Sequence, residues 1–185
     1  MRQLFGSLLA FALLAGGVAL AGGNVESGLK EGEFPKAFTV LDVTGPKAGE
    51  RLCYRCRFGP RPVVTIFSRG VDDNLARLVK QVDAKVAENQ GREMQAFVVV
   101  LSDNVEQTEK QLVSFQKKHG IEHVPLTVFR GQEGPADYEI SKDADVTVLM
   151  WKKLEVKSNH AFADSGALDA KTVEQIVADT AKILE

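Results

Sequence analysis

The chain has few cysteines and histidines and no long basic run. Its 185 residues include two cysteines, Cys53 and Cys56, and three histidines. Basic and acidic residues are interspersed and the formal net charge is −2, so nucleic acid is not an expected partner. The sequence contains no internal repeat and no low-complexity tract. Its length beyond the first 21 residues suits one domain with a substantial core.

The first 21 residues have the layout of a secretory signal peptide. Arg2 precedes an apolar run, and Ala19-Leu20-Ala21 forms a small-x-small cleavage site. No cysteine at this site means no lipoprotein anchor there, and no basic stop-transfer cluster follows, so a membrane anchor is the less favoured alternative. We predict a signal peptide at 1–21, a polar, glycine-rich flexible arm at 22–36 and one domain at 37–185. The protein is therefore expected to be exported, to the periplasm or the extracellular space, without a stable membrane anchor after cleavage.

Six segments have the apolar patterns of strands. One alternates apolar and polar residues, and others are short apolar runs that suit strands buried on both faces. The six predicted strands cover 38–43, 63–67, 96–101, 126–129, 146–151 and 154–157. Lys152-Lys153 is an unfavourable turn pair for joining the last two.

Three helices are predicted between and after these strands. The first begins at Asp72 or Asp73, either of which can cap it. The second covers 106–119, with Asn104 as its cap and Gly120 as its stop. The third begins at Asp169, and its inward stripe consists of Val173, Ile176, Val177, Thr180 and Leu184. The order strand, helix, strand, helix indicates an α/β sheet with right-handed crossovers.

The segment from His119 to Phe129 resembles the thioredoxin fold. A helix ends in Gly120-Ile121, and Val124-Pro125 then leads into an apolar strand. Residues 38–67 look like the N-terminal extension of peroxiredoxins and secreted thioredoxin-like proteins, in which a strand and a glycine-containing loop precede a Pro-Val-Val strand. The resemblance implies an α/β fold with a thioredoxin-like mixed sheet, flanking helices and an N-terminal strand extension.

The resemblance also implies a site at Pro125. In the family this proline is cis and its bend lies beside the redox cysteines; the alternative is an ordinary trans proline that opens a strand. A substrate groove would then include His123, Val124 and Pro125. His123 would act there as a general base or contact a peptide, or else be an exposed loop histidine.

The cysteines depart from the family pattern. Thioredoxins carry Cys-x-x-Cys after the first core strand, at the start of a helix that lowers the thiol pKa. The matching segment here, 68–73, has no cysteine, and the peroxidatic cysteine of peroxiredoxins is missing from the same region. Cys53 and Cys56 precede the strand instead. Since a strand that ends at the active face begins at the opposite end of the sheet, we expect Cys56 to lie toward the far end from Pro125, unless its loop folds back along the domain.

Three interpretations of Cys53 and Cys56 remain open from the sequence. They form a redox-active pair, because Arg51, Arg55 and Arg57 would favour a thiolate. Alternatively they form a static disulfide, which is expected in an oxidising compartment. In the third interpretation they bind a metal or haem.

The third interpretation has the weakest support. Arg57 rather than histidine follows Cys56, so the c-type haem signature is incomplete. His119 and His123 have a His-x-x-x-His spacing that suits zinc, but His123 belongs near Pro125. We expect neither a cofactor nor a metal.

The leading hypothesis is a secreted thiol–disulfide oxidoreductase with Cys53 and Cys56 as catalytic residues. The alternative is a redox-inactive binding or scaffold module with a structural disulfide. The expected partners are protein thiols and disulfides, or a peptide segment.

Overall fold

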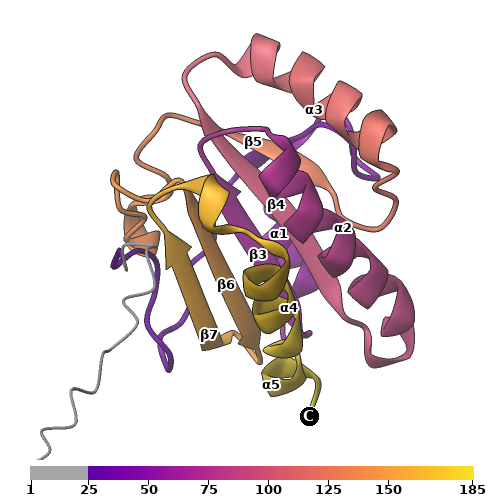
Figure 1. The fold of residues 1–185 in the computed structure, drawn as a ribbon, viewed down its shortest axis with the longest axis vertical. Helices are drawn as coiled ribbons and strands as arrows, with labels where there is room; N and C mark the ends of the chain where they lie inside the picture. Colours follow the sequence, from indigo (N-terminus) through magenta and orange to yellow (C-terminus); the bar gives the residue numbers. More distant parts are fainter. Residues whose placement is uncertain (1–24) are drawn as a thin grey trace, which may run out of the picture.

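The computed structural model describes residues 25–185, and the predicted signal peptide lies outside them. These residues form a seven-stranded sheet in the order β2-β1-β5-β4-β3-β6-β7, flanked by helices (Figure 1). The strands are β1 (Val40–Asp42), β2 (Arg51–Leu52), β3 (Val63–Ser68), β4 (Gln95–Ser102), β5 (Leu126–Arg130), β6 (Val146–Lys152) and β7 (Glu155–Phe162). The α-helices are α1 (Tyr54–Phe58), α2 (Asp73–Glu88), α3 (Val105–His119), α4 (Ala170–Ala178) and α5 (Ala181–Leu184). Short 3₁₀ turns are η1 (Gln90–Arg92), η2 (Ala136–Tyr138) and η3 (Ser165–Ala167).

The sheet is mixed, with a parallel centre. β3, β4 and β5 run parallel, β6 runs antiparallel to β3, and β7 runs antiparallel to β6. β1 pairs antiparallel with β5 and β2 with β1, which makes the N-terminal strands an extension of the sheet. The predicted mixed α/β sheet and its N-terminal extension are therefore present. Within residues 25–185 no helix has the length and apolar content needed to cross a membrane.

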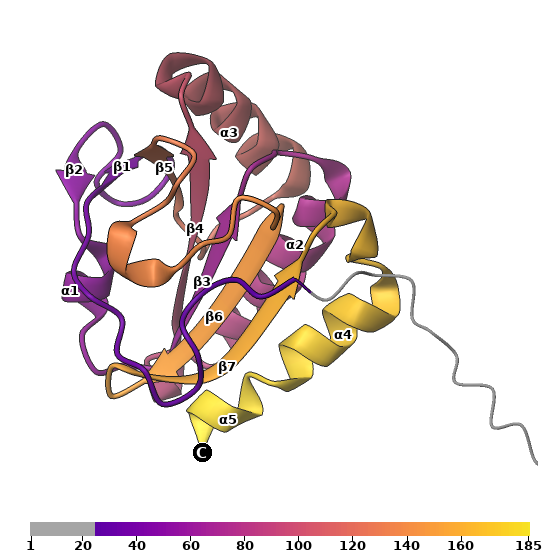
Figure 2. The same cartoon turned by 90° about the vertical axis from the view of Figure 1, so that its left-hand side faces the viewer.

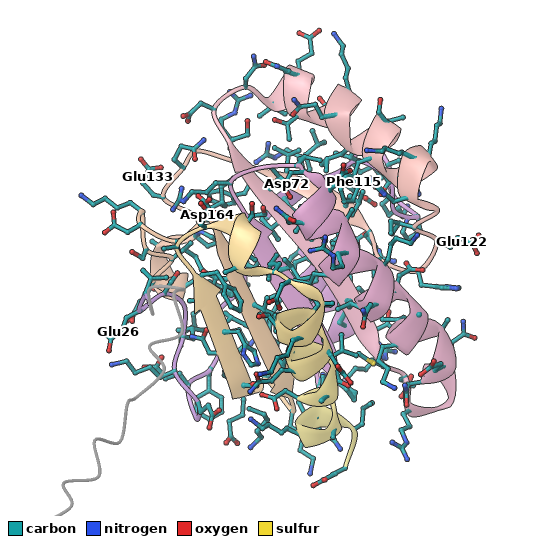
Figure 3. All side chains as sticks on the ribbon, in the orientation of Figure 1. Glu26, Asp72, Phe115, Glu122, Glu133 and Asp164 are labelled. Carbon is teal, nitrogen blue, oxygen red and sulfur yellow. A yellow bond between two sulfur atoms is a disulfide. The ribbon has the colours of Figure 1, made fainter. Side chains whose placement is uncertain are left out.

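The predicted helix caps are confirmed. Asp72, labelled in Figure 3 at the start of α2, accepts a hydrogen bond on Oδ1 from the Leu75 N–H at 2.8 Å. Asn104 accepts one from Gln107 N–H at 3.2 Å at the start of α3, and Gly120 ends that helix with a φ of 65°. These side chains satisfy amides that a helix end leaves without partners.

The last helix differs from the prediction in one respect. Asp169 caps α4, and Val173 and Ile176 are buried as predicted. The helix is interrupted after Ala178, however, and α5 begins a new register. As a result Ile183 is fully buried, and Leu184, which the helical stripe predicted to face inward, is only partly buried.

The β6–β7 hairpin forms in spite of its turn sequence. Lys153 and Leu154 have φ values of 54° and 63°. Two consecutive residues with positive φ match the twist of antiparallel strands, although glycine or asparagine is usual there.

The two faces of the sheet have different covers. α2, α3 and α4 bury one face in a large aliphatic cluster that includes Leu78, Val82 and Leu112. The other face holds most of the buried aromatic side chains and is covered by α1, η2 and the N-terminal segment. In Figure 2, α1 lies to the left of the strands and α4 to their right. The short helix with the cysteines therefore belongs to the aromatic face.

The predicted flexible arm is packed where the structure describes it. Asn159 in β7 donates to the carbonyls of Ser27 and Leu29, both at 2.9 Å, and Val156 N–H donates to the Glu33 carbonyl at 2.9 Å. Leu29 is buried. From Ser27 onward this segment is thus held along β7. The polar, glycine-rich composition of this segment does not predict the packing, because backbone groups make most of the contacts.

Candidate functional site

The two cysteines form a disulfide across the start of α1. Their Cα atoms lie 5.2 Å apart, and no cysteine is free. Cys53 is the N-cap residue, and its Sγ accepts a hydrogen bond from the Cys56 N–H at 3.1 Å. Cys56 is exposed, whereas Cys53 is partly buried. The sequence did not predict this helix, and its presence puts a Cys-x-x-Cys pair at a helix start after all.

Aromatic packing holds α1 in place. Tyr54 and Phe58, one turn apart, are 2% and 8% exposed and lie on the Phe97 ring. At the other end of the helix, Arg61 Nη1 donates to the carbonyls of Arg57 and Phe58 at 3.1 and 3.3 Å. These contacts position the cysteines without relying on the bond between them.

A buried carboxylate connects α1 to the preceding loop. Asp42 is fully buried and accepts hydrogen bonds from the N–H groups of Gly45 and Lys47 and from the Tyr54 hydroxyl, each at 2.8 Å. Burial, and then the hydrogen bond to Asp42, raise the pKa of Tyr54 far above its usual range. The phenol therefore stays protonated and remains a donor.

Cys56 and Pro125 lie at the same end of the sheet, so the prediction that they are far apart is wrong. Pro125 precedes β5, and β5 runs parallel to β4 and β3, so all three strands begin at one end. α1 lies directly before β3 and reaches that end too. A depression of about 680 Å³ there is lined by Tyr54, Arg57 and Phe58 of α1, together with His123 and Pro125.

The prediction of a cis proline is also wrong. No peptide bond among residues 25–185 is cis. The strand that lies antiparallel beside β3 is β6, not β5. The segment next to the carboxyl end of β3 is accordingly Asp145, whose carbonyl accepts the Arg69 N–H at 3.0 Å. The resemblance predicts that Pro125 precedes the strand next to the end of the sheet where the family has its active site. In the structure Pro125 precedes β5, which pairs with β4 and not with β3.

The predicted groove residues only partly come together. His123 is exposed and, with Pro125, lines the depression, whereas the Val124 side chain is 2% exposed and packs into the core. Asp83 of α2 holds this loop: its Oδ1 accepts the N–H groups of Glu122, His123 and Val124 at 3.1, 2.7 and 3.0 Å. Nothing in the sequence marks Asp83 for this role, because it is one of several polar residues on its helix.

An arginine lies at the end of the sheet where the family carries its cysteines. Arg69 follows β3, and its guanidinium donates to the carbonyls of Gln132, Ser141 and Ala144 at 2.5, 2.8 and 2.9 Å. Ser68 donates to the Gly70 carbonyl at 2.7 Å. This end contains no thiol, and its polar groups are engaged in holding the loops together.

The histidines do not form a metal site with the cysteines. His119 packs on the Phe115 ring at 4.8 Å, and its Nε2 lies 3.5 Å from Asp73 Oδ1. Across residues 25–185 no group of three or more His, Cys, Asp or Glu side chains is arranged to hold a metal ion.

A second polar cluster, which the sequence analysis did not single out, joins β7 to the end of α4. Asp179 Oδ2 accepts from Ser158 Oγ at 2.8 Å and lies 3.1 Å from His160 Nε2, which is itself 3.2 Å from Ser158 Oγ. Ser158 Oγ and Asp179 Oδ2 both lie near the same ring nitrogen of His160, Nε2. In a Ser-His-Asp triad the serine and the aspartate bind different ring nitrogens, so this cluster is not such a triad. Burial lowers the pKa of His160, although Asp179 opposes the shift. The cluster is interpreted as structural.

Comparisons with known proteins identify the fold. No family model matches the sequence, and neither does any curated protein. Among solved structures, a putative thiol:disulfide interchange protein DsbE from Chlorobium tepidum matches with a TM-score of 0.60 and 14% identity, over 82% of this chain and 99% of that one. The peroxidoxin BcpB from Mycobacterium tuberculosis matches with a TM-score of 0.60 and 14% identity, over 84% and 98%. The chain has a thioredoxin-like fold.

Further neighbours of this thioredoxin-like chain include a secreted disulfide oxidoreductase from Mycobacterium tuberculosis, with a TM-score of 0.52 and 9% identity over 78% of this chain and 94% of that one. The predicted fold is thus confirmed, together with the disulfide. At such low identities the likeness shows the fold alone.

Proposed function

We propose that the protein is an exported thiol–disulfide oxidoreductase that exchanges at Cys53–Cys56. The observation that carries the proposal is a solvent-accessible disulfide at the start of α1, with the Cys56 N–H directed at Cys53 Sγ at 3.1 Å. A Cys-x-x-Cys pair in such a position favours a thiolate, and so does nearby positive charge from Arg57. The partners would be protein thiols and disulfides.

The different exposure of the two residues supports a different role for each. A substrate thiolate attacks the exposed Cys56 sulfur, the Cys53–Cys56 bond breaks, and Cys53 leaves as a thiolate that accepts the Cys56 N–H. A second substrate thiolate then attacks the substrate sulfur of the mixed disulfide, and Cys56 leaves as a thiolate. The substrate is thereby oxidised to a disulfide and the protein is reduced to a dithiol; the reverse sequence reduces a substrate.

A purely structural role for the disulfide is less favoured. Cross-linking residues only three positions apart removes little chain entropy. Tyr54 and Phe58 already fix α1 in the core. Reduction would therefore leave the helix in place, as repeated exchange requires.

The alternative is a redox-inactive binding or scaffold module. One observation favours it: at the end of the sheet where the family carries its cysteines, this chain has Arg69, whose guanidinium binds three loop carbonyls. In this case the depression near His123 would bind a partner and the disulfide would never turn over.

Insulin reduction with single-cysteine variants separates these functions. We expect the wild-type protein to be active and both Cys53→Ser and Cys56→Ser to be inactive. Ser68→Ala, at the family's usual site, should keep full activity. The Cys53→Ser variant should also trap a mixed disulfide at Cys56. Equal activity in the wild type and the double cysteine variant, or none in either, would rule out the exchange function.

Export is part of the proposal and has its own test. The N-terminal sequence motivates it, and one structural neighbour is a secreted protein. Mass spectrometry of the mature protein should find Gly22 at or near the N-terminus. Recovery of intact Met1 in membrane fractions would contradict export.

A further inference from the structure

The depression beside α1 presents polar groups, most of which have no part in the proposed exchange reaction. It has a volume of about 680 Å³, within the usual range for ligand pockets. Its polar lining residues with ionisable or amide side chains include Arg57, Arg61, Gln90, Glu93, Gln95 and His123. Such groups recognise a polar ligand rather than an apolar one.

The charges that line the depression do not cancel. Arg61 is engaged, because its Nε lies 3.1 Å from Glu93 Oε1 and its Nη1 donates to two carbonyls. Glu93 is the only acidic residue of the lining. Glu122, next to His123, points away from the molecule (Figure 3). Within residues 25–185 the Arg57 guanidinium has no hydrogen-bonding or ion-pair partner, so it remains available to an anion.

We infer that the depression binds an acidic segment of the substrate polypeptide that adjoins the substrate's reactive cysteine. The inference rests on the proposed function, because Cys56 would hold that cysteine. Arg57 follows Cys56 directly, and an extended chain advances about 3.3 Å per residue, so residues next to the reactive cysteine reach the depression. Arg57 would pair with a carboxylate, and the exposed side-chain amide of Gln90 would form hydrogen bonds with the peptide backbone.

Exchange rates with two peptides provide the first test. One peptide has glutamates beside its cysteine and the other has glutamines. We expect the acidic peptide to react about threefold faster with the wild type, which is the effect of one exposed ion pair. Arg57→Glu should reverse this preference and Arg57→Gln should remove it. Arg130→Glu is the matched control, since it makes the same charge change at the opposite, exposed end of β5 and should preserve the preference.

Binding without exchange provides the second test. The same peptides with serine in place of cysteine cannot form a mixed disulfide, and titration calorimetry measures their binding to the oxidised protein. Preference for the acidic peptide, lost in Arg57→Glu and kept in Arg130→Glu, supports the inference even if insulin reduction is absent. Equal binding of both peptides, or equal losses in the two variants, overturns it, even if the cysteines prove active.

Discussion

Replacing Asp83 is expected to release the loop that forms one wall of the depression. Asp83 is 8% exposed, and one of its oxygens accepts three backbone N–H groups. A hydrogen bond to a charged group contributes about 1.5–3 kcal/mol. Glu122 and His123 are exposed, so in the variant their N–H groups would form hydrogen bonds with water. The hydrogen bond from the Val124 N–H to Asp83 is buried, so in the variant this N–H would have no partner. We therefore expect Asp83→Ala to lower the free energy of unfolding by about 2–4 kcal/mol, less than the sum of three bonds.

Denaturant unfolding of the oxidised protein measures this loss. Asp83→Asn keeps an oxygen at the same place and should cost about half as much. Glu88→Ala, on the same helix and in a surface pair with Lys85, is the control and should change stability by less than about 0.5 kcal/mol. Hydrogen exchange should show that the His123 amide loses protection only in the Asp83 variants. A loss below about 1 kcal/mol in Asp83→Ala would refute the reasoning, since three charge-assisted bonds cannot be worth so little.

Three further predictions concern titration and packing. Because burial lowers the pKa of His160, this side chain binds a proton more readily in the unfolded chain, so stability falls as the pH drops below about 6.5. Denaturation midpoints measured from about pH 7.5 to about pH 5 should fall less in His160→Gln than in the wild type. An equal fall in the two proteins would contradict this. Burial raises the pKa of both tyrosines, Tyr54 and Tyr138, so tyrosinate absorbance should stay flat until alkaline unfolding, and a step near pH ~10 in the folded protein would disprove it. A Cβ on Gly45 would lie 2.3 Å from the Tyr54 hydroxyl oxygen, whereas one on Gly49, with a φ of 86°, meets open space. Unfolding should show a loss of about 3 kcal/mol for Gly45→Ala and about 1 kcal/mol for Gly49→Ala, and the reverse order would be evidence against the packing.

The elements with strong local signals were predictable from the sequence. Apolar runs located the central strands, and Asp72, Asn104, Gly120 and Asp169 marked helix ends through hydrogen bonds to residues only a few positions away. These interactions are local, so the pattern of residues is enough to reveal them.

The features that depend on distant contacts were not predictable. α1 has five residues and forms because Tyr54 reaches Asp42, twelve positions away. β5 and β6 are both short apolar strands, and nothing in either run shows that β6 rather than β5 pairs with β3. The sequence prediction gave β5 the position that β6 occupies, and it therefore placed Pro125 at the wrong end of the sheet. The role of Asp83 depends on amides 39 to 41 positions away.

The reduction potential of the Cys53–Cys56 pair tests the central claim most directly. The purified protein is equilibrated in glutathione buffers, and alkylation of each cysteine is followed by mass spectrometry. Exchange at the start of α1 predicts a potential between about −270 and −120 mV, the range of known exchange catalysts. A pair that stays oxidised below about −300 mV, as structural disulfides do, would contradict it.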